Sequence, residues 1–537
     1  MPEREQREAN ERLLLQVAVV AAVALGVVIR AVYVLSEDFP LNDGGLFYAM
    51  VRDLQAARYQ LPAFTSYNEA GIPFAYPPLG FYAAGLLADL TGLSLVTVFH
   101  LLPLVATSLT VVAFFFLARA MLSSRIAVVV AVCAFALIPR SFIWLLMGGG
   151  VTRSFGLLFA ILALHQVYLL YTRPDWRTQL RATLFAALTV LSHLETGAFL
   201  AFSIAVFFLA CGRHRRGVIS SVLLAAGTVL LTAPWWATVV LRHGIEPFVA
   251  AGATGGSVFT GGYIRWFLLI TVARFGLGFT GEPLFPVIGV LAVLGGLTSL
   301  VRGQWLLPAW WAAIILLDER AFPTYTTLPI ALLVGIGVAD LLLPALRRLG
   351  AQTPPAPHVP HWAPQWVPAL VLVLLLCYAT VAALTRDRRL GSETWYMVSL
   401  SKDERAAMRL VADAPPHSSR FLVITGAAWP TDKTSEWFPA LTRQMSVVTA
   451  QGYEWLPGGV FEQRADAYAE AQACAQQDVS CLERWAAKTG TAFTYIYVPQ
   501  PGPGQCCTTL PLLTSLRTEP RYLVVYDAAG ATIATRR

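Results

Sequence analysis

The sequence predicts a mainly α-helical protein, with a polytopic bundle of transmembrane helices followed by a small α/β domain. Hydrophobic residues make up 56% of the 537 residues and charged residues only 13%, and the mean hydropathy is +0.59. A soluble globular chain carries roughly 25% charged residues, so this chain has too little polar surface to be soluble throughout. Long apolar runs end near residue 385. The remaining residues have the mixed composition of a domain folded in water.

About eleven apolar runs are candidate membrane crossings, because a helix needs about 20 apolar residues to span the hydrocarbon core. The first run follows the charged start MPEREQREANER and does not resemble a cleavable signal peptide. Arg265 and Arg274 interrupt residues 263–280, and the pattern leaves this region ambiguous. The predicted crossings are 13–35, 94–122, 126–146, 154–172, 182–193, 196–211, 217–240, 283–301, 303–317, 324–345 and 365–385.

Basic turns between the apolar runs set the predicted orientation. Membrane proteins concentrate arginine and lysine in cytoplasmic loops, so we attribute the net charge of +7 largely to these turns and not to nucleic-acid binding. An odd number of crossings places all the turns in the cytoplasm, provided that 263–280 does not fully span. In the membrane domain 1–385, the loop 36–93 then faces outward and the proline-rich segment 351–364 is a cytoplasmic linker. The basic segments are the N-terminus, 173–181, 212–217, Arg302 and Arg347-Arg348.

Residues 386–537 are predicted to form an extracytoplasmic α/β domain, because strand-like runs alternate there with helical segments. The domain contains Cys474, Cys481, Cys506 and Cys507. Disulfides are permitted outside the cytoplasm, and four cysteines allow three pairings, among which the sequence does not choose. Four free thiols in a cytoplasmic tail are the alternative. The strand-like runs are 420–426, 445–450, 493–498 and 522–527.

Asp43 stands out among the charged residues of the loop 36–93. It lies in PLNDGG, directly before a helical pattern of apolar residues. A carboxylate at a helix N-terminus stays ionised, because backbone N–H groups and the helix dipole favour its charge. Such a carboxylate can take a proton from a hydroxyl group, although a simple helix N-cap is the alternative. Further along the loop, Tyr76-Pro-Pro-Leu contains paired prolines, which can open a helix but not continue one.

The order of these features resembles the GT-C glycosyltransferases, which are polytopic enzymes that use polyprenyl-phosphate-linked sugars. The resemblance rests on NDGGLFYAMVRDL (42–54), the Tyr76 turn and the late segment DERAFPTY (318–325), and it covers roughly residues 10–345. Gly44 stands where a second acid often stands in the family. The protein resembles the group of protein mannosyltransferases, aminoarabinose transferases and oligosaccharyltransferases.

This resemblance implies that Asp43 is the general base and that arginines hold the lipid phosphate. Arginine suits a leaving phosphate, because its planar fork is always charged and binds two oxygens at once. Arg320 and Tyr325 carry the family match, and Arg153 follows glycines that allow close approach of a ligand. Tyr76 is a further substrate-binding candidate. The outward-facing arginines are Arg140, Arg153, Arg265, Arg274 and Arg320, and each has the alternative of a snorkelling interfacial anchor.

His193 and Glu195 lie in SHLET, between two short apolar runs. Imidazole and carboxylate groups suit zinc or manganese, so these residues are candidates for substrate binding or for a metal site with Asp43. A hydrogen-bonded polar turn is the alternative. In the family the oligosaccharyltransferases need a metal and other branches do not, which leaves a divalent cofactor such as magnesium or manganese open.

Aromatic residues stand beside carboxylates twice in the α/β domain, in SEWFP (435–439) and QGYEWLP (451–457). Carbohydrate sites often combine the two, because sugar C–H faces pack on rings while hydroxyl groups bond to acids. We therefore expect this domain to cover the site or to bind the acceptor. A packed core that buries Trp437 and Trp455 is the alternative.

We expect an inverting glycosyltransferase in the bacterial inner membrane, which moves a sugar from a polyprenyl-phosphate donor to a hydroxyl group of a lipid, glycan or protein. The absence of a GxxxxGK[ST] motif argues against ATP-driven transport. The rival interpretations are a lipid-linked glycan flippase, which predicts internal repeats and broken helices near the midplane, and a scaffold that presents the α/β domain to a partner.

Overall fold

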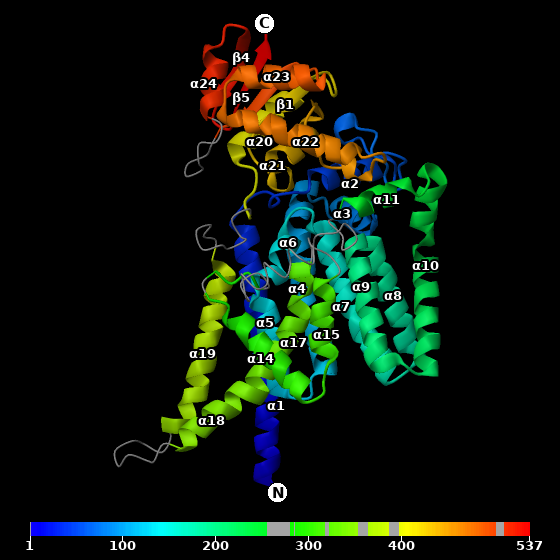
Figure 1. The fold of residues 1–537 in the computed structure, drawn as a ribbon, viewed down its shortest axis with the longest axis vertical. Coiled ribbons are helices and arrows are strands. Elements are labelled where there is room, and N and C mark those ends of the chain that lie inside the picture. Colours follow the sequence, from blue (N-terminus) through cyan, green and yellow to red (C-terminus); the bar gives the residue numbers. More distant parts are fainter. Residues whose placement is uncertain are drawn as a thin grey trace.

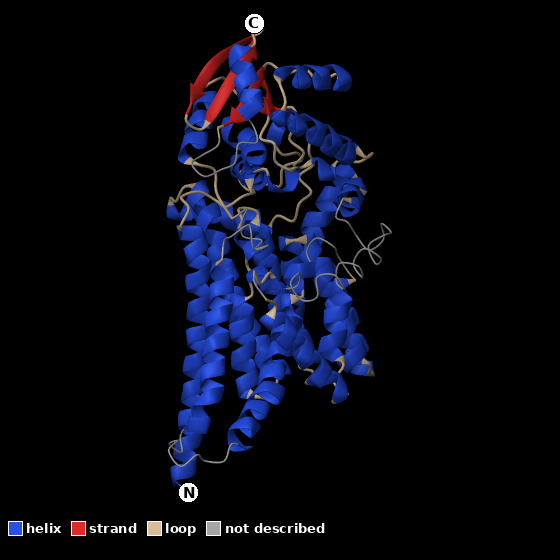
Figure 2. Cartoon of the chain, turned by 60° about the vertical axis from the view of Figure 1, so that its left-hand side comes forward, coloured by secondary structure: helices blue, strands red, loops and turns tan. Residues whose placement is uncertain are grey.

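A bundle of long helices supports the α/β domain at one end, and the N-terminus lies at the opposite end (Figure 1). The computed structural model describes residues 2–254, 280–283, 285–316, 322–352, 363–385, 397–500 and 510–537. The arrangement of a helical bundle with a C-terminal α/β domain confirms the predicted architecture. Figure 2 shows the same two parts, with the strands confined to the end near the C-terminus.

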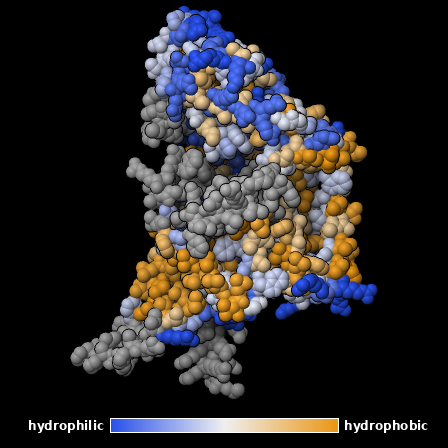
Figure 3. Space-filling view, viewed as in Figure 1, coloured by the Kyte–Doolittle hydropathy of each residue, from blue (hydrophilic) through white to orange (hydrophobic). Residues whose placement is uncertain are grey.

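Among the described residues, seven helices are long and apolar enough to cross a membrane. Their outer surfaces expose large apolar side chains such as Leu241 and Val20, and Figure 3 shows a hydrophobic zone over the bundle below a mostly hydrophilic domain. The chain is thus a multi-pass membrane protein. The seven helices are Leu13–Leu35, Leu95–Met121, Gly150–Thr172, Leu194–Gly212, Arg215–His243, Pro323–Arg348 and Trp366–Leu384.

The other predicted runs contain helices that do not meet this length and hydropathy, so the predicted count of eleven crossings stays a prediction. The shorter apolar helices are α3 (Leu79–Thr91), α5 (Arg125–Leu137), α14 (Val287–Val301) and α15 (Leu306–Ile315). The remaining helices of the bundle and its loops are α1 (Pro2–Leu35), α2 (Gly45–Ala56), α4 (Leu95–Met121), α6 (Ile143–Leu146), α7 (Gly150–Thr172), α8 (Trp176–Ser192), α9 (Leu194–Phe207), α10 (Arg215–His243), α11 (Glu246–Ala253), α16 (Phe322–Tyr325), α17 (Thr327–Ile336), α18 (Leu343–Gln352) and α19 (Ala363–Leu384).

The run predicted to cross the membrane as one helix over 126–146 is broken in the structure. Helix α5 ends at Leu137, a 3-10 turn follows over Pro139–Ser141, and α6 is only one turn long. Pro139 cannot supply the backbone N–H that a continuing helix needs. The buried Arg30 guanidinium stabilises the break, because it donates to the Ala136 carbonyl oxygen at 2.9 Å. The chain then reverses through Met147–Gly149 into α7.

The α/β domain contains one five-stranded sheet in the order β2-β1-β3-β5-β4. Strand β1 is parallel to both of its neighbours, whereas β5 is antiparallel to β3 and β4. Four strands coincide with predicted runs, and β5 was not predicted, because ATIATR lacks a run of large apolar residues. The strands are β1 (Arg420–Val423), β2 (Met445–Ser446), β3 (Tyr495–Pro499), β4 (Tyr522–Ala528) and β5 (Ala531–Arg536), and the helices are α20 (Lys402–Ala412), α21 (Lys433–Thr442), α22 (Val460–Ala473), α23 (Val479–Thr489) and α24 (Leu510–Thr518).

Cysteine usage agrees with the predicted disulfide in this domain. Cys474, at the end of α22, is bonded to Cys481 in α23. The other two cysteines of the domain, Cys506 and Cys507, lie outside the described residues. Of the three possible partners of Cys474, the structure therefore shows Cys481.

The α/β domain packs directly on the loop 36–93. The Trp437 indole donates to the Asn42 carbonyl oxygen at 2.9 Å, and the Tyr67 hydroxyl donates to the Glu436 carbonyl oxygen at 2.7 Å. Asn68 exchanges two hydrogen bonds with the backbone of Ser446. Trp437 is fully buried and Trp455 is only 8% exposed, as the packed-core interpretation predicted for both. One hydrophobic core therefore joins the loop to the domain, and it fixes the position of the domain relative to the loop.

Candidate active site

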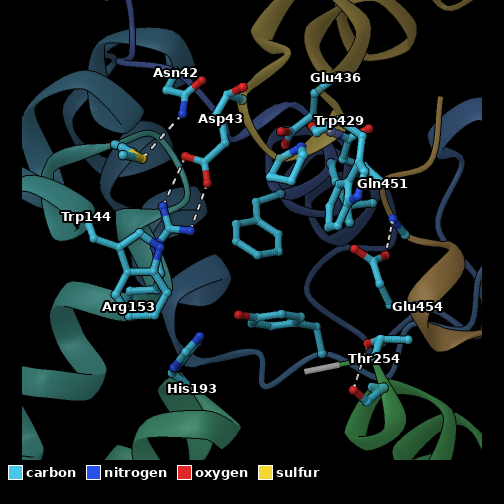
Figure 4. Close-up of a pocket in the computed structure, with 18 of the residues that line it drawn as sticks. Asn42, Asp43, Trp144, Arg153, His193, Thr254, Trp429, Glu436, Gln451 and Glu454 are labelled. Atoms are coloured by element: carbon cyan, nitrogen blue, oxygen red, sulfur yellow. Dashed lines mark hydrogen bonds and ion pairs between the residues drawn. The ribbon is translucent and has the colours of Figure 1, made fainter. Parts of the chain in front are cut away.

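A cavity of about 470 Å³ lies where the α/β domain meets the ends of the membrane helices (Figure 4). Segments from distant parts of the sequence supply its walls, from the first loop to the α/β domain. The lining residues are Asn42, Asp43, Leu46, Phe47, Tyr76, Arg140, Ile143, Trp144, Met147, Arg153, His193, Ala251, Thr254, Pro323, Thr324, Trp429, Pro430, Thr431, Glu436, Gln451, Gly452, Glu454 and Trp455.

Asp43 and Arg153 form a paired contact in this cavity. Nη1 of Arg153 lies 2.8 Å from Oδ2 of Asp43, and Nη2 lies 3.0 Å from Oδ1. The backbone N–H of Gly149 also donates to Oδ1, at 2.9 Å. Two parallel charge-assisted hydrogen bonds orient both side chains. The structure thus brings the predicted base together with one of the predicted phosphate-binding arginines.

The Asp43 carboxylate lies at the start of α7 and not at the start of α2. Helix α2 starts at Gly45 as expected, but its N-cap is Gly44 and no side chain caps it there. The interpretation of Asp43 as the cap of α2 is therefore wrong, and the carboxylate lies at the N-terminus of α7 instead. Close packing demands glycine here, since a Cβ on Gly148 would lie 2.0 Å from the Asp43 carbonyl oxygen.

Arg153 occupies the first turn of α7 and lines the cavity. Its side chain is nearly buried, and its guanidinium lies over the Trp144 ring, 4.9 Å from the centroid. An aromatic face attracts such a cation. Arg140, from the turn after α5, also lines the cavity. The bundle end of the cavity is consequently rich in positive charge.

Glu436 supplies a second carboxyl group from helix α21 of the α/β domain. Its Oε1 accepts a hydrogen bond from the Gly44 N–H at 2.9 Å, next to the start of α2. Burial, with a further contribution from the charge of Asp43, raises the pKa of Glu436 to about 8. At neutral pH the Glu436 carboxyl group is therefore largely protonated, whereas Asp43 is paired with Arg153 and Glu454 adds a third carboxyl group to the cavity. The sequence pointed to Glu436 only through its aromatic neighbours.

His193 lines the cavity, and Tyr325 lies behind it. The His193 ring caps α9, where Nδ1 accepts the Thr196 N–H at 3.3 Å and lies 2.9 Å from the Thr196 hydroxyl. Tyr325 also contacts that hydroxyl at 2.9 Å and stacks on Phe199. Tyr325 is not among the described residues that line the cavity. Its placement supports the role of a scaffold for His193, whereas Tyr76 lines the cavity directly.

Several predicted site residues lie outside the described residues, and the cavity contains residues that the sequence did not predict. Arg320, Arg274 and Arg265 belong to the former group. Trp144 and Trp429 belong to the latter, since neither is part of a recognisable motif. An aromatic side chain beside a buried arginine becomes visible only once the chain is folded.

Comparison with protein-family models and with curated protein sequences gives no match. Solved structures do resemble the chain. ArnT from Cupriavidus metallidurans bound to undecaprenyl phosphate is 16% identical with a TM-score of 0.53, and the match covers 96% of this chain and 97% of that one. Oligosaccharyltransferase from Archaeoglobus fulgidus, in complex with Zn and sulfate, is 13% identical with a TM-score of 0.53, covering 90% and 68%. Arabinofuranosyltransferase AftD from Mycobacteria is 16% identical with a TM-score of 0.57, covering 98% and 40%.

The chain has the GT-C glycosyltransferase fold. The predicted resemblance is thereby confirmed at the level of the fold. It extends past residue 345, the end of the sequence resemblance, because the match to ArnT covers nearly the full length of both chains. In this GT-C fold, the cavity described above is bounded by the first loop, the start of α7 and the C-terminal domain.

The GT-C fold includes a zinc-bound neighbour, so we tested whether the predicted metal ligands fit a metal here. Both oxygens of Asp43 face Arg153, and His193 lies 3.9 Å from Glu195. The described part of the chain contains no group of three His, Cys, Asp or Glu residues arranged to hold a metal ion. The residues seen here do not form a metal site, and no chemical step is assigned to a metal.

Proposed function

We propose that this protein is an inverting glycosyltransferase that takes a sugar from a polyprenyl-phosphate donor and transfers it to an acceptor hydroxyl group. The observation that carries the proposal is the Asp43–Arg153 pair in a cavity at one end of a GT-C bundle. The similar ArnT structure is bound to undecaprenyl phosphate, which supports a donor of that class. We place the reaction at the outer face of a bacterial inner membrane, in keeping with the distribution of basic turns.

The geometry supports a division of labour between Asp43 and Arg153. A phosphate group offers Arg153 the same forked pair of oxygens as the Asp43 carboxylate does. When the donor phosphate binds, it competes for the guanidinium and releases Asp43 to accept the proton of the acceptor hydroxyl. The acceptor oxygen then forms a bond to the anomeric carbon, and the bond from that carbon to the phosphate oxygen breaks. The lipid phosphate leaves with the electron pair, next to the positive charge of Arg153.

A second cavity supports a lipid-linked donor. It has a volume of about 350 Å³, lies between α1, α5, α14, α17 and α19, and is lined almost entirely by apolar side chains. An isoprenoid chain would find there the apolar contact that it has in the bilayer. Leu137 lines this cavity, and Arg140, only three residues further on, lines the polar one. One short segment therefore contacts both, as a lipid tail and its phosphate require.

Replacing Asp43 by asparagine tests the proposal. General-base catalysis contributes about 10²–10⁴-fold to rates, so we expect Asp43→Asn to lose that much transfer from undecaprenyl-phosphate sugars, and thermal unfolding establishes that the variant is folded at the assay temperature. Asp89→Asn is the matched control, since Asp89 is exposed on α3 and lies outside the cavity. A variant Asp43→Asn with wild-type transfer would exclude Asp43 as the base, as the flippase and scaffold interpretations predict.

A further inference from the structure

The two sides of the larger cavity differ in chemistry. In Figure 4, Asp43, Arg153 and Trp144 lie on one side, and Trp429, Gln451 and Glu454 lie on the other. The first side belongs to the membrane bundle and carries the guanidinium groups. The second side belongs to the α/β domain and carries carboxyl, amide and indole groups. A phosphate can pair with guanidinium groups only on the first side, because the described lining residues of the second side include no arginine or lysine.

We propose that the second side is a carbohydrate subsite, which binds the sugar ring of an acceptor that is itself a glycan. This inference rests on the proposed function and narrows its acceptor to one class. We call the residues Trp429, Gln451, Glu454 and Trp455 the sugar platform. Sites for small ligands combine aromatic walls with a few fixed polar groups, and flat indole rings fit the C–H faces of a sugar.

Gln451 is the residue that most directly indicates a missing ligand. Its Nε2 donates to the Trp429 carbonyl oxygen at 2.9 Å, which fixes the amide plane. Gln451 is only 7% exposed, and its buried Oε1 has no hydrogen-bond partner among the described residues. Buried polar atoms are nearly always paired in native proteins. A sugar hydroxyl group is a donor of the right kind to satisfy this oxygen.

Each of the two indole rings packs edge-on against another aromatic side chain. Trp429 packs edge-on against Phe461, with ring centroids 5.3 Å apart. Trp455 packs against Tyr76 at 5.5 Å, and Tyr76 belongs to the loop that also carries Asp43. Such support keeps the rings rigid, so little side-chain entropy is lost on binding.

Glu454 and Glu436 complete the polar part of this side. Glu454 accepts the Gly452 N–H at 2.6 Å, which holds its carboxyl group at the cavity wall. Glu436, from α21, stands between the sugar platform and the start of α2, where it contacts Gly44. A ring seated on the platform would thus meet carboxyl groups along its edge and would direct a hydroxyl group toward Asp43.

Direct binding of simple sugars tests the subsite without any donor. The probes are methyl α- and β-glycosides of glucose, galactose, mannose and arabinose, measured by saturation-transfer difference NMR on the full-length protein in detergent. We expect at least one glycoside to receive saturation at its ring C–H protons. Gln451→Leu and Trp429→Ala should each weaken that binding about ten-fold, the effect of losing one hydrogen bond or stacking contact.

Two control variants separate the subsite from the catalytic proposal. Gln477→Leu removes an exposed glutamine elsewhere in the α/β domain and should bind like wild type. The binding assay contains no donor and measures no transfer, so glycoside binding of Gln451→Leu and sugar transfer by Asp43→Asn are independent readouts and the two proposals can fail separately. The subsite is refuted if no glycoside binds at millimolar concentration, or if Gln451→Leu and Trp429→Ala bind as tightly as wild type. Thermal unfolding of each variant establishes that a lost signal reflects the site and not a misfolded protein.

Discussion

Replacing Glu436 by glutamine should make the protein more stable at neutral and alkaline pH, and this prediction follows from one buried acid. Glutamine is nearly isosteric with glutamic acid, and its carbonyl oxygen can still accept the Gly44 N–H that Glu436 accepts at 2.9 Å. Unlike the acid, it cannot become charged. The substitution therefore removes the titration and leaves the packing of α21 against α2 intact.

The sign follows from the direction of the pKa shift. The Glu436 carboxyl has a pKa of about 8 in the folded protein, against 4.5 as its ordinary value. Below pH 4.5 this carboxyl group is protonated in both the folded and the unfolded chain, so it does not change the free energy of unfolding. Between 4.5 and 8 the unfolded chain releases the proton while the folded chain keeps it, so the stability of the wild type falls as the pH rises. Above pH 8 both states are ionised and the loss is complete.

The magnitude comes from the same two values. Each pH unit between them costs 1.36 kcal/mol, so the full loss is at most roughly 5 kcal/mol. Thermal unfolding of the full-length protein in detergent, measured from pH 4 to pH 9, should show wild type and Glu436→Gln converging at acid pH. The two should diverge steadily as the pH rises. Glu462→Gln, at an exposed position on α22, is the control and should follow wild type. Parallel curves for wild type and Glu436→Gln would refute the assignment of a buried, protonated acid.

Two further predictions concern the α/β domain and its contact with the loop. Gly45→Ala should lower the free energy of unfolding by about 1–3 kcal/mol, because the added Cβ would lie 2.4 Å from the Glu436 carbonyl oxygen; Gly252→Ala, where a Cβ meets nothing within 4 Å, should not destabilise. Thermal unfolding compares the two, and equal stability would contradict the close approach. The double variant Cys474→Ser/Cys481→Ser should lose about 2–3 kcal/mol, because the disulfide closes a short loop with a sequence separation of 7. A reducing agent should destabilise the wild type by a similar amount and leave the double variant unchanged; a reductant effect on the variant would assign it to another bond.

The pairing of the site residues illustrates what the sequence could not resolve. Asp43 was identified from its loop, and Arg153 was one of five outward-facing arginines, among which the sequence favoured Arg320 first and Arg153 next. The contact between Asp43 and Arg153 joins residues 110 positions apart, and no local pattern shows which arginine the carboxylate contacts. Glu436 lies 392 positions from Gly44, and its elevated pKa results from burial that exists only after the domain docks on the loop.

Composition and periodicity were sufficient for the architecture. Many long apolar runs indicate helices inside a bilayer. The strand and helix patterns after residue 385 carry the polar residues of a domain that folds in water. The sequence by itself therefore determined a membrane bundle with a C-terminal α/β domain. The tertiary structure decided which side chain Asp43 faces and which walls enclose the cavity. These features depend on contacts between distant segments, whose energies come from burial and close packing and leave no mark on any one stretch of the chain.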